Sequence, residues 1–182
     1  MSEFIAWLER LNAQDSKARA VLRRSLAFDP GQYRDAYHYV EPFVTGENNT
    51  WRWKMHYLVA GLWAAHWREG RSGLPISVAK AAALFDSEKR QKLSLDERRK
   101  TTSTEKRFIT LLDADQDQLA HRLRQMITLL KERDIDFSAL LKDVVYWNDE
   151  QKRTQNAWAR DFYRTLNHDT DPHTSTETET AE

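Results

Sequence analysis

Hydrophobic side chains recur along this chain at the three- and four-residue spacing of α-helices, and no stretch alternates apolar with polar residues for long. The clearest stripes are those of Phe4, Trp7, Leu8 and Leu11 near the start and of Trp158, Phe162 and Leu166 near the end. Only five Gly and four Pro interrupt the helical pattern. The spacing therefore predicts an all-α fold made of two helical bundles.

Side chains suited to helix capping precede the hydrophobic stripes. We expect helices to follow the caps Ser16, Thr50, Thr102, Asp115, Asp136 and Asp149. The helix after Thr50 should continue to about Trp67, and Gly70 and Gly73 should end it. A shorter helix is predicted from about Ser77 to Phe85.

Residues 86–101 are highly charged and lack an apolar face, which predicts a solvated connector or flexible loop. This connector would separate an N-terminal bundle, residues 1–85, from a C-terminal bundle, residues 102–168. Residues 169–182 contain five acids and no Lys or Arg, so we expect a disordered, Thr-rich acidic tail.

The charge of the chain is segregated, although its formal net charge is zero. Without the tail, 28 basic and 23 acidic side chains remain, which gives residues 1–168 a net charge of +5. A basic body with an acidic tail indicates a polyanionic partner.

The chain has no Cys, no apolar run at its start typical of a signal peptide, and no stretch apolar enough to span a bilayer, so we expect a cytoplasmic protein without a membrane partner.

Catalytic and metal-binding motifs are not evident. The six His residues lack the spacing of zinc ligands. Asp113, Asp115 and Asp117 resemble the first half of an EF-hand loop, but Gln118 stands where that loop needs Gly and Arg124 where it needs a bidentate Glu. Helix capping explains these acids better, so we expect no metal, no cofactor and no enzymatic activity.

Two interpretations apply to the aromatic group on the predicted long helix, Trp51, Trp53, Trp63 and Trp67. Their helical spacing favours packing in the core. Exposed rings would instead form a platform on which nucleic-acid bases could stack.

Basic residues form clusters on several of the predicted helices. The candidate nucleic-acid-binding residues are Arg19, Arg23, Arg24, Lys80, Lys106, Arg107, Arg122, Arg124, Lys152 and Arg153. Any one of them could simply solubilise a surface. Their repetition across helices favours a surface that follows phosphates and does not read base sequence.

Several short segments occur in an order that resembles a known family. The segments are Ala20–Arg24, Tyr39–Phe43, Ile76–Ala82, Ser103–Phe108, Leu111–Asp115, Leu123–Arg124 and Asp161–Phe162. Over roughly residues 4–166, this series resembles the small subunit (CasB) of Cascade, the type I-E CRISPR surveillance complex.

The resemblance implies an all-α, non-enzymatic subunit with two helical bundles. Such subunits associate as a tandem pair beside the backbone and large Cascade subunits. Their basic residues help to hold the hybrid of guide RNA and target DNA and the displaced strand of the R-loop. Arg23, Arg24, Lys80, Lys106, Arg107 and Arg124 match basic positions of the family, whereas Arg19, Arg122, Lys152 and Arg153 are candidates by charge and placement.

Two other classes of function compete with this interpretation. A helical protein–protein adaptor would use its charges only for solvation and would have negligible affinity for single-stranded DNA. A metal-dependent nuclease would use Asp113, Asp115 and Asp117, which we expect instead to lie at helix ends.

Overall fold

The computed structural model describes residues 2–44, 50–70 and 73–170, so most of the predicted acidic tail lies outside the described residues. The α-helices are α1 (Glu3–Gln14), α2 (Ser16–Ser25), α3 (Tyr37–Val40), α4 (Trp51–His66), α5 (Val78–Gln91), α6 (Leu95–Arg98), α7 (Ser103–Leu112), α8 (Gln116–Leu129), α9 (Phe137–Val145) and α10 (Arg153–Thr170). Two 3₁₀ turns, η1 (Arg34–Ala36) and η2 (Glu41–Phe43), flank α3. The regular structure of the described residues is otherwise limited to one isolated parallel bridge, between Ile76 and Ile135. The predicted all-α fold is confirmed.

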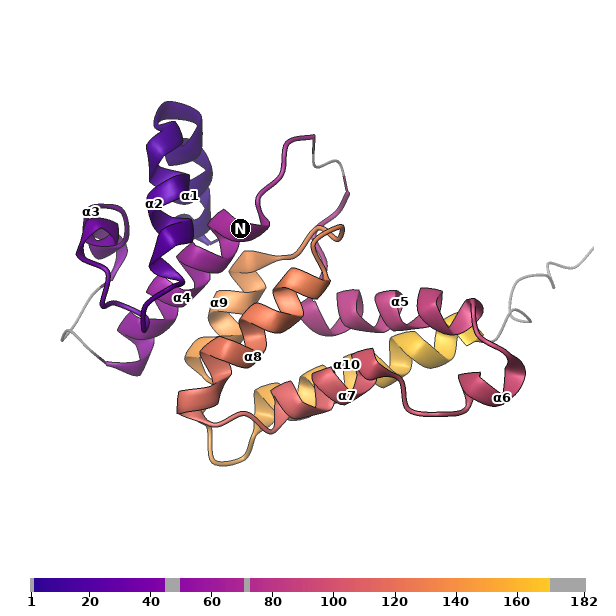
Figure 1. Ribbon diagram of the computed structural model, residues 1–182. Helices are drawn as coiled ribbons and strands as arrows, with labels where there is room; N and C mark the ends of the chain where they lie inside the picture. The colour runs from indigo at the N-terminus through magenta and orange to yellow at the C-terminus, as the bar shows by residue number, and fades with distance from the viewer. Residues whose placement is uncertain (1, 45–49, 71–72, 171–182) are drawn as a thin grey trace, which may run out of the picture.

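Helix α4 lies at the centre of the N-terminal part of the molecule. It packs against α2, α8 and α9, and its residues 55–64 are all buried. Figure 1 shows α1 to α4 gathered at one side, α5, α6, α7 and α10 at the other, and α8 and α9 between them. The helices that carry Arg19 and Arg124 therefore both pack on α4.

Helix α5 packs mainly against α10 and also against α7, as Figure 1 shows. It continues through Gln91, so the predicted helix end at Phe85 and the predicted loop over the first part of residues 86–101 are wrong. The cause is a polar contact that a hydrophobic pattern does not reveal. Asp86 is fully buried, and Arg90 bridges it to Glu105 of α7 with two contacts of 2.6 Å. The division of the chain into two bundles at this connector stays a prediction.

Capping residues begin most helices as predicted. The side chains of Thr50, Thr102, Asp115 and Asp136 accept hydrogen bonds from backbone N–H groups in the first turns of α4, α7, α8 and α9. Asp15, and not Ser16, caps α2. Helix α10 begins at Arg153, four residues after the predicted cap Asp149, and continues to Thr170, beyond the predicted boundary at residue 168.

The indole N–H groups explain how so many Trp side chains can be buried. Trp53 and Trp63 are 3% and 0% exposed, and their N–H groups donate to carboxylates of Glu41 and Glu9. Trp158 donates in the same way to Asp143, whose pKa burial raises above its ordinary value. A buried N–H group without a hydrogen-bond partner costs free energy, so these carboxylates allow the Trp side chains to be buried in the core. The core interpretation is confirmed for Trp53 and Trp63, while Trp51 and Trp67 pack against the core and stay partly exposed.

Candidate nucleic-acid interface

A hollow between α7 and α8 brings two of the predicted site residues together. Arg107 of α7 and Arg124 of α8 line a cavity of about 370 Å³, with His121, Gln125 and Thr128 of α8 as the other lining residues. We call it the Arg107–Arg124 hollow. Neither arginine forms an ion pair within the described part of the chain. Two guanidinium groups facing one cavity without carboxylate partners form a site suited to a phosphate.

Arg124 has a further property that distinguishes it from a solubilising charge. Its Nε atom is buried and has no hydrogen-bond partner among the described residues. A buried N–H group that loses water without gaining an acceptor costs about 1–3 kcal/mol. Because this part of the side chain is buried, Arg124 is held within the fold and is not extended into solvent.

A second hollow lies on the other side of Arg124 and reaches α2 and α4. It has a volume of about 260 Å³, and its lining residues are Leu26, Leu62, Ala65, His66, Arg124, Ile127, Thr128 and Lys131. We call it the Leu26–Lys131 hollow. Arg124 and Thr128 line both hollows, so the two are adjacent, and we call them together the depression beside α8. The cationic side chains of the Leu26–Lys131 hollow are Arg124 and Lys131, and most of its other lining residues are apolar.

Arg19 extends the positive charge from this depression along α2. Its guanidinium carbon lies 3.9 Å from the centroid of the Trp67 ring, which fixes the side chain by a cation–π contact. Arg23 follows one helical turn after Arg19 on the same face, and Leu26 comes one turn later at the edge of the second hollow. Arg24 is also exposed, on the neighbouring part of the α2 surface.

The other predicted site residues are not part of these hollows. Lys106 is exposed on α7 beside Arg107, and Arg122 is partly buried on α8. Lys80 is exposed in the first turn of α5. Lys152 and Arg153 are exposed at the start of α10, where Arg153 pairs with Asp149 at 3.3 Å. Their role in nucleic-acid binding stays a prediction.

Five polar lining residues of the depression were absent from the sequence-based candidates: His66, His121, Gln125, Thr128 and Lys131. Lys131 lies in the turn that follows the end of α8 at Leu129, so spacing within the helix could not have identified it. Its carbonyl oxygen accepts from Arg68, which also pairs with Asp134 at 2.7 Å and so holds the end of α8 in place.

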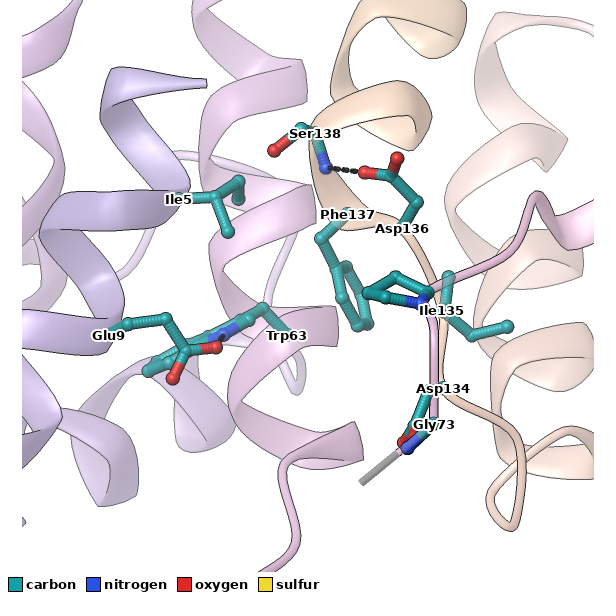
Figure 2. Close-up of a pocket in the computed structure, with 10 residues that line it drawn as sticks. Ile5, Glu9, Trp63, Gly73, Asp134, Ile135, Asp136, Phe137 and Ser138 are labelled. Atoms are coloured by element: carbon teal, nitrogen blue, oxygen red, sulfur yellow. Dashed lines mark hydrogen bonds between the residues drawn. The ribbon is translucent and has the colours of Figure 1, made fainter. Parts of the chain in front are cut away.

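A third cavity has the opposite charge and does not suit a phosphate. Figure 2 shows Glu9, Asp134 and Asp136 around a floor that includes Trp63 and Phe137, in a cavity of about 440 Å³. Each of the three carboxylates already accepts at least one hydrogen bond, from an indole, a guanidinium or backbone N–H groups.

The acids considered for a nuclease are at helix ends. Asp115 Oδ1 accepts from the backbone N–H groups of Asp117 and Gln118, 3.1 and 2.9 Å away, and so caps α8. The described residues contain no group of three or more His, Cys, Asp or Glu side chains that could hold a metal ion. None of the helices formed by these residues has both the length and the apolar character needed to cross a membrane.

Comparison with known proteins gives consistent matches. Residues 18–163 match the family model of the CRISPR-associated protein Cse2. A curated Cse2 protein of Thermus thermophilus is 42% identical over 165 residues, which cover 88% of each chain. The crystal structure of a Cse2-family protein from the same organism is similar with a TM-score of 0.73 at 41% identity, covering 90% of this chain and 99% of the other. A chain of a CRISPR RNA-guided surveillance complex is similar with a TM-score of 0.70 at 26% identity, covering 92% and 93%.

Proposed function

Because the chain belongs to the Cse2 (CasB) family, the small subunits of the type I-E CRISPR surveillance complex Cascade, we propose that it binds nucleic acid in such a complex without catalysing a reaction. In this role it associates with the backbone and large subunits and with a second copy of itself. It stabilises the hybrid of guide RNA and target DNA and the displaced strand in antiviral defence. The observation that carries the proposal is the Arg107–Arg124 hollow, in which two guanidinium groups without an ion-pair partner among the described residues line one cavity.

The energetics of R-loop formation explain why such a subunit needs no reactive group. The RNA–DNA hybrid that forms is about as stable as the DNA duplex that it replaces. A small additional affinity for the opened state therefore shifts the equilibrium. Lys and Arg contacts provide that affinity by releasing counterions from phosphates, and they do so for any sequence.

The structure favours a defined phosphate contact over a diffuse positive surface. Arg124 is partly buried, and the hollow beside it is lined by apolar side chains that include Leu62 and Ile127. Charge-assisted hydrogen bonds are stronger where water is excluded. We therefore expect the partly buried Arg124 to contribute more to affinity than the exposed Lys106 or Lys80.

The test is a double charge reversal, Arg107→Glu with Arg124→Glu, in the full-length chain and in the assembled complex. The affinity for single-stranded DNA should fall at least about tenfold at low salt. The negative slope of log affinity against log salt should become shallower by about one to two. R-loops in the assembled complex should dissociate faster.

A matched control reverses two exposed cations outside the hollows, Lys142 on α9 and Arg164 on α10. If both double variants lose the same affinity, net charge explains binding and the hollow is not the site. If neither the wild-type chain nor the assembled complex has measurable affinity for nucleic acid, the adaptor function replaces the proposed one.

A further inference from the structure

Phe28 presents a large aromatic surface to solvent just after α2. It is 47% exposed, and its ring stacks on that of Tyr33 with centroids 5.0 Å apart and an interplanar angle of 16°. Tyr33 is partly buried and packs against the core. One face of Phe28 is therefore covered and held in orientation, while the other face is open.

The turn that carries Phe28 is held in place by backbone hydrogen bonds. The Phe28 N–H donates to Ser25 O at 3.1 Å, and the Gln32 N–H donates to Asp29 O at 2.9 Å. An exposed ring fixed in this way loses little conformational entropy when a planar group stacks on it. That distinguishes Phe28 from a mobile exposed apolar side chain.

Two cationic side chains precede this ring along the chain. Arg23 and Arg24 are exposed one turn before it and form no ion pair within the described residues. Leu26, two residues before Phe28, lines the Leu26–Lys131 hollow. The next residue, the acid Asp29, lines a separate cavity of about 370 Å³, whose other charged lining residues are Lys54 and Asp117.

We propose that Phe28 is a base-stacking residue, on which an unpaired nucleotide rests while Arg23 and Arg24 contact its neighbouring phosphates. This inference rests on the proposed nucleic-acid function and specifies its ligand as a single strand. Bases in a duplex already stack on both faces, whereas an unpaired base has a free face for an aromatic ring. The Phe28 surface therefore prefers an unpaired strand to a duplex or a hybrid.

The experiment measures binding of the full-length chain to a single-stranded DNA that contains 2-aminopurine, and to a duplex of the same length. Phe28→Ala should weaken single-strand binding about fivefold or more and abolish the fluorescence change caused by stacking. Duplex affinity should stay within about twofold of wild type. Phe28→Trp should retain single-strand binding, and Phe28→Leu, which keeps apolar volume on Tyr33 but lacks an aromatic face, should behave like Phe28→Ala.

The control is Tyr146→Ala, which removes another exposed aromatic side chain, located after α9 and 60% exposed. If the wild type binds single strands and Phe28→Ala binds them equally well, the Phe28 inference is wrong while the proposed function still stands. The inference also fails if Phe28→Leu restores affinity, or if Phe28→Ala instead changes the oligomeric state, since Phe28 would then contact protein. If the wild type binds neither strand form, alone or assembled, the proposed function fails and the inference with it.

Discussion

Gly31 shows how one residue can determine the turn between α2 and η1. Its φ of +87° lies in the left-handed region, and a Cβ placed on it would lie 1.9 Å from the Trp53 ring. The carbonyl oxygen of Gly31 also accepts from the Tyr37 hydroxyl at 2.8 Å. The turn that positions Phe28 and Tyr33 thus depends on the absence of a side chain at Gly31.

We predict that Gly31→Ala lowers the free energy of unfolding by at least about 2 kcal/mol, because backbone strain and overpacking against Trp53 act together. Gly70→Ala is the matched control, since Gly70 also has a positive φ, of +71°, but nothing lies within 4 Å of its added Cβ. That variant should lose only about 1 kcal/mol. Urea denaturation measures both, and equal losses would show that Trp53 moves aside at little cost.

Individual residues show how much of the candidate site could be predicted from the sequence. Arg107 and Arg124 were predicted from charge and from a family resemblance, and the structure places them at one hollow. Their convergence depends on the packing of α7 against α8, which no spacing within either helix encodes. Phe28 was not predicted, because an exposed ring after a helix looks in sequence like any loop aromatic.

At the scale of elements, apolar spacing and caps predicted most helices, and the errors have a common cause. Helix α5 was ended too early because its last turns are held by charges and not by apolar side chains. Arg90 contacts Asp86, Glu105 and the carbonyl oxygens of Arg98 and Lys100, so it joins α5, α7 and the connector. A charged run looks solvated in sequence because a buried ion pair and an exposed one have the same composition.

We predict that Arg90→Ala lowers the free energy of unfolding by about 3 kcal/mol or more, because it leaves the buried Asp86 carboxylate without its cation. Backbone amides of α6 should also exchange with solvent faster, since the Arg98 and Lys100 carbonyls lose their donor.

The control is Arg99→Ala, which removes a neighbouring exposed arginine. Its unfolding and its amide exchange should match wild type. Equal effects of the two substitutions would mean that connector charge, and not the Arg90 contacts, sets the stability of this region.

At the scale of the whole molecule, the segregation of charge adds to the effect of any single contact. The full chain is formally neutral, whereas residues 1–168 carry +5. Net charge acts on a polyanion beyond contact distance and changes the association rate more than the dissociation rate. The acids at the end of the chain should therefore slow encounter with nucleic acid even without a fixed docking position.

We predict that deleting residues 171–182, which removes Asp171, Glu177, Glu179 and Glu182 and leaves a net charge of +4, speeds association with single-stranded DNA by a few-fold at low salt. The difference should disappear at high salt, where the screening length falls to about 3 Å at 1 M. Stopped-flow fluorescence measures the rates, and a full-length variant with the four acids changed to Asn or Gln is the matched control. If that variant associates as fast as the deletion, charge alone is responsible. If it associates like wild type while the deletion is faster, the segment acts by occlusion and the electrostatic prediction is wrong.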